Sequence, residues 1–472
     1  MVALSDRKIE IVRTLVQSAP DKIVGGLRAA LQEATGDTVL ASVRQLVEAE
    51  AQDRALRNAI FAPIAPLCVG DGKSAAGVTF PAQALALIWR GVKASAPAQI
   101  QAAVRAQAAA AAAEAAEQGH RPADPGAAYN AVVATARAAL DDSEQREFRA
   151  AAELCDAARP GGAAAFAAGL DIAPIVRRAI PRLHDWTTHS GGEVGAAARL
   201  AYKDSVAISP DAGPLFFEML AGQLDPPWLV LRIISAVMDK PNERYLADSE
   251  LSGFPERVLD AIDGSLKAIG RMDLDGGPET GRATGRLAEL VTQQTFEVET
   301  WIELSRDHGW GKRLHEQKLS LASLVEGRLK EAEKLVAAAL PMESSGFGRR
   351  RSSGPKLDAA PSPRDVGRAL TALHFAHEVR LCANYGGFSA AHAKITEKLA
   401  AAIEGYVEEV LDHARTGDVP DLMLARDHLY VAADLIGLVR DEKATELVRR
   451  RAASTCASQE PPHPGEAVVL DA

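Results

Sequence analysis

The sequence is poor in the residues that mark several common protein classes. It has only 4 cysteines in 472 residues, which excludes a fold held together by a dense set of disulfides. Aromatic residues make up only 5% of the chain. Basic residues are not in excess, because Lys and Arg total 53 against 63 Asp and Glu, a formal charge of −10. A protein that binds nucleic acid through a broad basic surface is therefore not expected.

Long apolar runs are also missing. The longest extends from Trp228 to Met238 and contains Arg232, so it is far shorter than the ~20 residues needed to cross a bilayer. The N-terminal segment lacks the apolar core of a signal peptide. We therefore expect no membrane span and a cytoplasmic location, in which the four cysteines stay reduced: Cys68, Cys155, Cys382 and Cys456.

Alanine is abundant, with 91 residues, and it is the strongest helix former. This content, together with many arginines, favours an origin in a GC-rich bacterial genome. Apolar residues recur at helical spacing in many segments, whereas alternating strand patterns are almost missing. Two long stripes are Leu287, Leu290, Val291, Val298, Trp301 and Ile302, and then Leu321, Leu324, Val325, Leu329, Ala332, Leu335 and Val336. We predict an all-α fold, either a multi-helix bundle or an irregular array of helical hairpins in two modules.

One region departs from the helical pattern. Residues 67–69 and 78–80 are predicted to pair as a small β-hairpin near residues 67–80. The Gly-rich loop between them contains Gly70-Asp71-Gly72-Lys73-Ser74, which resembles the end of a phosphate-binding loop. The complete motif requires a glycine where Leu67 stands, so we favour a solvated loop over a nucleotide site.

Composition divides the chain into five segments. Alanine falls from 54 residues in positions 1–200 to 37 in the remainder, which suggests differently packed modules. We predict an Ala-rich helical module with an insertion at 63–81, a helical region leading into long amphipathic helices, a flexible basic linker, a C-terminal helical module and a disordered tail. Their respective boundaries are 1–240, 241–342, 343–361, 362–453 and 454–472.

Two short motifs predict helix ends. Ser362-Pro363-Arg364-Asp365 is typical of a helix start, with Ser as the cap and an acid in the first turn. Thr416-Gly417-Asp418 is typical of a turn in which Gly ends one helix and Asp caps the next.

No catalytic, cofactor or metal site is predicted. The alternative is a helical-bundle enzyme, or a small-molecule or metal-binding protein, with its site in the C-terminal module. Its candidate ligands are His374, His377 and Glu378, which share neighbouring positions of one helix face. The spacing of the di-iron carboxylate proteins and the His-Glu-x-x-His motif are both absent from the sequence, so we favour surface histidines. Residues 184–192, with His184 and His189, are a second polar cluster, which a helix end explains without a ligand.

The remaining candidates concern partners. Arg349–Arg351 could contact a nucleic acid or another anion, an acidic partner or a membrane surface, but we favour a role in keeping the linker soluble. The apolar C-terminal run Glu466–Ala472 could dock into a groove. The tryptophans are candidate anchors for a partner, and Trp310 is expected to be exposed at a break between helices. We predict a helical scaffold or adaptor that mediates protein–protein interaction in the bacterial cytoplasm. The sequence indicates neither the partner nor the oligomeric state.

Overall fold

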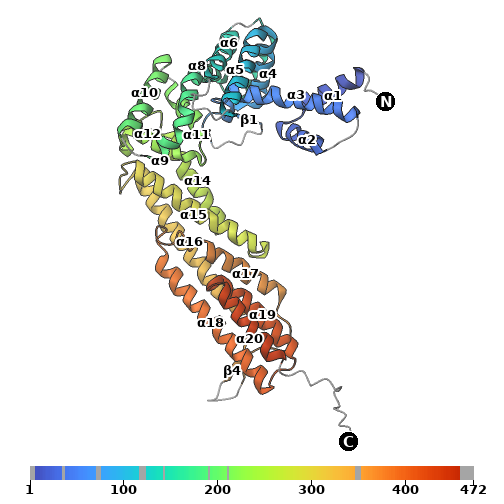
Figure 1. Cartoon of the computed structure of the whole chain (residues 1–472). Coiled ribbons are helices and arrows are strands. Elements are labelled where there is room, and N and C mark those ends of the chain that lie inside the picture. The colour runs from blue at the N-terminus through green and yellow to red at the C-terminus, as the bar shows by residue number, and fades with distance from the viewer. Residues whose placement is uncertain are drawn as a thin grey trace. The chain divides into compact units, whose positions relative to one another are not determined.

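The computed structural model describes residues 6–33, 38–70, 76–115, 124–141, 144–189, 192–209, 212–345 and 352–457. Over these residues the protein is all-α apart from two pairs of very short strands, which confirms the predicted fold class (Figure 1). The chain divides into two compact units. Unit 1 comprises Met1–Pro241 and Tyr245–Phe254, and unit 2 comprises Asn242–Arg244 and Pro255–Ala472.

Unit 1 is an assembly of short and medium helices. Its elements are α1 (Asp6–Ser18), α2 (Asp21–Glu33), α3 (Thr38–Ile60), β1 (Cys68–Val69), β2 (Phe80–Pro81), α4 (Ala82–Ser95), α5 (Pro97–Ala115), α6 (Gly126–Asp141), α7 (Arg146–Ala158), α8 (Gly162–Ala179), α9 (Leu183–Thr188), α10 (Gly192–Ile208), α11 (Ala212–Ala221) and α12 (Val230–Met238). Helices α1 and α2 pack on α3, and α8 packs against α6, α7, α10 and α11. The apolar core of unit 1 therefore gathers around α8.

Arg54 on α3 holds the first two helices in place. Its side chain is only 9% exposed, and its Nη2 donates to the carbonyl of Val16 at 2.9 Å. Its Nη1 donates to the carbonyl of Ala19 at 2.8 Å and to Asp21 Oδ1 at 2.6 Å. The guanidinium therefore satisfies carbonyl groups that the end of α1 would otherwise leave unpaired.

The two strands near residues 67–80 pair, but not as the predicted hairpin. β1 and β2 are parallel, with Cys68 opposite Phe80, whereas the strands of a hairpin are antiparallel. Phe80 is buried and packs edge-to-face on Phe166 of α8, with the ring centroids 5.0 Å apart. We attribute the parallel direction to this burial, because two residues per strand stabilise a pairing less than a buried aromatic ring does.

Unit 2 is built from longer helices that lie along one another (Figure 1). Its elements are α14 (Gly253–Gly270), which begins in unit 1, α15 (Pro278–Trp301), α16 (Gly309–Ala339), β3 (Met342–Ser345), β4 (Ser352–Pro355), α17 (Pro363–Glu378), α18 (Ser389–Thr416), α19 (Leu422–Val439) and α20 (Glu442–Ala457); the short α13 (Glu243–Ala247) is shared between the units. Helix α17 packs on α15, α16 and α19, and α18 packs on α16, α19 and α20. Both α17 and α18 therefore have neighbours on several sides.

Helices α15 and α17 approach each other unusually closely. A Cβ atom added at Gly281 would lie 2.1 Å from the carbonyl oxygen of Thr371, and one at Gly285 would lie 2.4 Å from Cβ of Glu378. Thr284, which lies between the two glycines, is also buried. Small residues on α15 thus allow α17 to pack against its backbone.

Glu243 fixes the start of α16. Its carboxylate is buried and accepts hydrogen bonds from the backbone N–H groups of Ser305 at 2.8 Å, of Gly311 at 3.3 Å and of Trp310. A carboxylate in this position satisfies unpaired N–H groups and lies at the positive end of the helix dipole. The first turn of α16 is therefore anchored from within unit 2.

The predicted helix-end motifs are found in part. Ser362 caps α17 by accepting a hydrogen bond from the N–H of Asp365 at 3.4 Å, as expected. Gly417 ends α18 with a φ of +77°, a left-handed conformation that favours glycine. The cap of α19 is Asp421, however, and Asp418 instead accepts a hydrogen bond from the Thr416 hydroxyl.

The segment predicted as a linker contains a β-ladder. β3 and β4 are antiparallel, with Met342 opposite Pro355 at one end of the ladder and Ser345 opposite Ser352 at the other. The next helix, α17, packs directly on α15 and α16. Residues 346–351 lie outside the described structure, and the predicted module boundaries stay a prediction.

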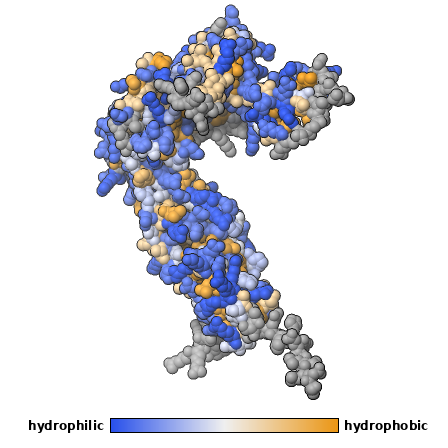
Figure 2. Space-filling model, in the orientation of Figure 1, coloured by the Kyte–Doolittle hydropathy of each residue, from blue (hydrophilic) through white to orange (hydrophobic). Residues whose placement is uncertain are grey.

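Polar residues cover most of the visible surface, with apolar residues in small separate groups (Figure 2). Among the described residues, no helix is both long enough and apolar enough to cross a membrane.

Candidate functional site

The residues of the metal-site alternative point to different neighbours. His374 Nε2 lies 3.4 Å from Arg282 Nη2 on α15, whereas His377 Nδ1 lies 3.2 Å from the carbonyl oxygen of Leu438 on α19. Burial and the nearby Arg282 lower the pKa of His374. Glu378 packs against α15. In the described part of the chain, no group of three His, Cys, Asp or Glu side chains is placed to hold a metal ion.

Two other histidines of unit 2 are buried and hydrogen-bonded. His392 Nε2 lies 2.8 Å from the carbonyl oxygen of Ala376. His428 lies between the carbonyl oxygen of Ala359, at 2.9 Å from Nε2, and the Tyr406 hydroxyl, at 2.9 Å from Nδ1. These contacts satisfy the imidazoles, so both residues serve the core.

Several sequence candidates lie outside the described residues: positions 71–75 of the Gly-rich loop, Arg349–Arg351 and the tail from 458 onward. They stay predictions. In the 184–192 cluster, His184 and His189 are exposed at the surface near α9.

The tryptophans mostly belong to the core. Trp89, Trp186 and Trp310 are 3%, 5% and 8% exposed, and Trp89 Nε1 donates to Asp53 at 2.9 Å. The expectation of an exposed Trp310 is wrong, because Glu243 holds its backbone at the buried start of α16. These three rings are not available as anchors for a partner.

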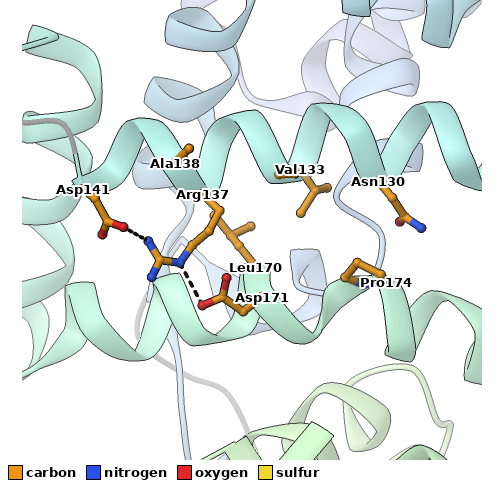
Figure 3. Close-up of a pocket in the computed structure, with 9 residues that line it drawn as sticks. Asn130, Val133, Arg137, Ala138, Asp141, Leu170, Asp171 and Pro174 are labelled. Carbon is orange, nitrogen blue, oxygen red and sulfur yellow. Dashed lines mark hydrogen bonds and ion pairs between the residues drawn. The ribbon is translucent and has the colours of Figure 1, made fainter. Parts of the chain in front are cut away.

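A pocket of about 380 Å³ lies between α6 and α8 in unit 1 (Figure 3). At one end Arg137 forms ion pairs with Asp141 of its own helix at 2.6 Å and with Asp171 of α8 at 2.8 Å. Asn130 and Pro174 lie at the other end (Figure 3). Because the charged groups of this pocket bind one another, they offer a ligand little beyond an apolar surface.

A larger opening, of about 650 Å³, lies between α16 and α18 in unit 2. We call it the α16/α18 groove. Its floor consists of buried apolar and aromatic side chains: Val336, Leu340, Leu399 and Tyr406. Its walls consist of exposed small residues: Ala337, Ala401, Ala402 and Gly405. Met342 of β3 also lines the groove and is 44% exposed.

Gly405 leaves the α18 wall of the groove open. A Cβ atom added there would meet no atom within 4 Å. Glycine inside a helix costs about 1 kcal/mol relative to alanine. No contact within the described chain offsets this cost, but the bare backbone would let another helix approach α18 closely.

Charged residues line the rim of the groove. Lys398 and Glu333 join α18 and α16 through an ion pair of 2.5 Å. Glu409 lies about three helical turns farther along α18. Its Oε2 atom is shielded from solvent and has no hydrogen-bond partner among the described residues. A carboxylate oxygen in this state is costly, so a donor brought by an occupant would stabilise it.

The titratable groups of the groove are few. Its titratable groups are the rim charges and the Tyr406 hydroxyl, which is hydrogen-bonded to His428. Burial raises the pKa of Tyr406, so the hydroxyl stays protonated. Among these lining residues, no nucleophile stands beside a base, as covalent catalysis would require.

The apolar pattern of the sequence does not reveal this groove. Its walls are alanines and a glycine, which contribute little to an apolar stripe. The available signal was the placement of Ala401, Ala402 and Gly405 on the exposed side of α18, among charged residues such as Lys398 and Glu404. No family model, curated protein or solved structure matches the chain.

Proposed function

We propose that the protein is a scaffold or adaptor of the bacterial cytoplasm that binds a partner protein in the α16/α18 groove. The observation that supports this most is the open space over Gly405, above a buried apolar floor. Amphipathic helices commonly bind in apolar grooves of this kind, with side chains at successive turns as anchors.

The elongated shape of the groove and the position of its polar groups favour a helix over a small molecule. From Lys398 to Glu409 the α18 wall is about 16 Å long, or three helical turns. Sites for small molecules typically bury most of the ligand and place a few polar groups within an apolar lining. Here the polar groups lie along the rim, and the space between the helices is apolar.

The rim charges define the chemistry of the occupant. Glu409 lies at one end of the α18 wall, so its carboxylate would pair with a Lys or Arg of the partner. Lys334, on the α16 wall, is exposed and has no ion pair among the described residues, so it would pair with an acid at the other edge. The partner segment is therefore an apolar helix with a basic residue on one edge and an acidic residue on the other. Such rim contacts contribute mainly to specificity and association rate.

Selection from a displayed library of helical peptides, each about 16 residues long, tests the proposal. We expect enrichment of peptides with apolar residues at helical spacing and a basic residue beside them. Gly405→Leu fills the groove and should weaken their binding by at least about tenfold. Gly327→Leu is the matched control, because Gly327 lies on α16 outside the groove and also has open space around it.

Both substitutions replace a helical glycine by a stronger helix former, so both variants should be at least as stable as the wild type. Loss of binding with Gly405→Leu alone would support the groove. Equal binding by both variants, or no enrichment of apolar helices, would contradict it.

A further inference from the structure

Helix α20 ends beside the α18 wall of the α16/α18 groove. Arg440, just before α20, pairs with Glu397 at 2.8 Å, and Arg451 in α20 pairs with Glu408 at 2.5 Å. The two ion pairs advance in the same direction along both helices, so α20 runs parallel to α18 and packs on it. Glu408 is three residues from Gly405 on α18, and residues at this spacing share one side of a helix. The side of α18 that α20 binds is therefore next to the groove.

The chain that follows α20 is long enough to reach the groove. Helix α20 ends at Ala457, six residues beyond Arg451, so its end lies level with about position 414 of α18. From there Gly405 is about 14 Å back along α18 and about 10 Å around it. Residues 458–466 include three prolines, which favour an extended chain, and nine such residues span up to about 28 Å. The residues after 466 can therefore enter the groove.

We infer that residues 466–472 of the same chain occupy the α16/α18 groove when no partner is bound, and that the partner must displace them. This regulation rests on the proposed function, since it concerns the same groove. Residues 467–470 are Ala, Val, Val and Leu, which match the apolar floor. In an extended chain they cover about 13 Å, most of the ~16 Å of the α18 wall. The segment and the groove therefore agree in length and in polarity.

The rim charges favour one direction of the segment. It enters near Glu409, because α20 ends beyond that end of the groove. Asp471, which follows the apolar run, then reaches the opposite end. Lys334 lies at that end, because the preceding Glu333 pairs with Lys398. Lys334 is exposed and has no ion pair among the described residues, so it is available to Asp471.

The segment matches the groove less completely than the proposed partner does. Residues 458–472 contain no Lys or Arg, so they bring no permanently charged donor to Glu409. Glu466 would instead add a like charge near that carboxylate. A partner helix with a basic residue at this edge therefore competes well. The segment still occupies the groove, because a tether gives it an effective concentration in the millimolar range, for which a dissociation constant of ~1 mM is sufficient.

Photo-cross-linking of the purified full-length chain tests the inference. With benzoylphenylalanine at Ala402, in the groove, we expect an adduct between position 402 and residues 466–472, found by mass spectrometry of the digest. The product should have the mass of one chain, and its yield should not depend on protein concentration. The same probe at Lys330, an exposed position of α16 outside the groove, should not form this adduct.

Two variants with the same change of charge test the contact. Leu470→Asp places a carboxylate on the apolar floor and should lower the yield of the adduct at least about fivefold. Gln459→Asp adds the same charge before the apolar run and should leave the yield unchanged. The peptides selected from the helical library should bind Leu470→Asp at least about threefold more tightly than the wild type, because the groove is then open. Circular dichroism of each variant confirms that the helices are formed.

The outcomes separate this inference from the proposed function. No adduct from Ala402, an adduct that joins two chains, or equal yields from the wild type and Leu470→Asp would overturn the inference. If the selected peptides nevertheless bind, and Gly405→Leu weakens their binding, the proposed function stands without this regulation. If the adduct forms as expected but the library yields no apolar helices, the segment occupies the groove and the proposed partner is wrong.

Discussion

Substitution of Gly281 by alanine should destabilise unit 2, although alanine is normally the better helix former. The added Cβ would lie 2.1 Å from the Thr371 carbonyl oxygen, 3.0 Å from its carbonyl carbon and 3.2 Å from the backbone nitrogen of Phe375. All three are backbone atoms of α17, so no side-chain rotation can relieve the overlap. Helix α17 must move away from α15, and its contacts with α16 and α19 must change with it.

The magnitude follows from two opposing terms. Overpacking of this kind costs up to about 3 kcal/mol. Replacement of a helical glycine by alanine returns about 1 kcal/mol. We therefore expect Gly281→Ala to lower the free energy of unfolding of unit 2 by about 2 kcal/mol, which corresponds to a melting temperature about 4 to 8 °C lower.

Urea unfolding followed by circular dichroism, with calorimetry, measures the effect. A chain with two compact units need not unfold in one step, so we expect a shift only in the transition of unit 2. Gly327→Ala is the control, because its Cβ would meet nothing within 4 Å and should raise stability by up to about 1 kcal/mol. A Gly281→Ala variant as stable as the wild type would refute the close packing of α15 and α17.

Other predictions concern buried polar groups. Arg54→Met removes the hydrogen bonds that hold α1 and α2, and should destabilise these helices by about 3 kcal/mol, seen as faster hydrogen exchange in α1 than in the wild type. Unchanged exchange would contradict this role. Burial raises the pKa of the Cys68 thiol to about 12 and of the Cys155 thiol to about 11. Both should resist iodoacetamide at about pH 8 in the folded protein and react in urea, as mass spectrometry can show; labelling of the folded protein would refute it. The lowered pKa of His374 means that the folded state resists its protonation. The part of the free energy of unfolding that depends on neutral His374 is fully present above about pH 6.5 and is lost as the pH falls below that value. The melting temperature should therefore fall more steeply between about pH 7 and pH 5 in the wild type than in His374→Gln, and parallel curves would contradict the assignment.

Much of the helical architecture can be predicted from the sequence because large apolar residues recur at helical spacing. In α16, Leu321, Val325 and Leu329 are buried as the stripe predicts, and the helix ends at Ala339, just before Pro341. The pattern works here because the buried face of α16 consists mainly of large aliphatic side chains.

The same reasoning is less accurate for α15. Of its predicted stripe, Leu287 and Leu290 are only partly buried, whereas Gly281 and Gly285 lie against α17. A pattern of large apolar residues cannot identify a helix face that packs closely because its residues are small. The same limitation concealed the α16/α18 groove, whose walls are alanine and glycine.

Tertiary contacts account for the other differences. The sequence predicts both strands near residues 67–80 but not their parallel direction. We attribute that direction to the burial of Phe80 against Phe166, a contact between residues far apart in the chain. Trp310 looked exposed because it lies between glycines. The carboxylate of Glu243, distant in sequence, makes that position a buried helix start.

The most direct test of the proposed function is photo-cross-linking in the host cell. A benzoylphenylalanine at Ala402, in the groove, should cross-link to one protein, at an apolar helical segment that carries a Lys or Arg. The adduct should be lost when Gly405→Leu is added, and should not form from the same probe at Lys330, an exposed position of α16 outside the groove. Identical adducts from both positions, or an adduct that persists with Gly405→Leu, would contradict binding in the α16/α18 groove.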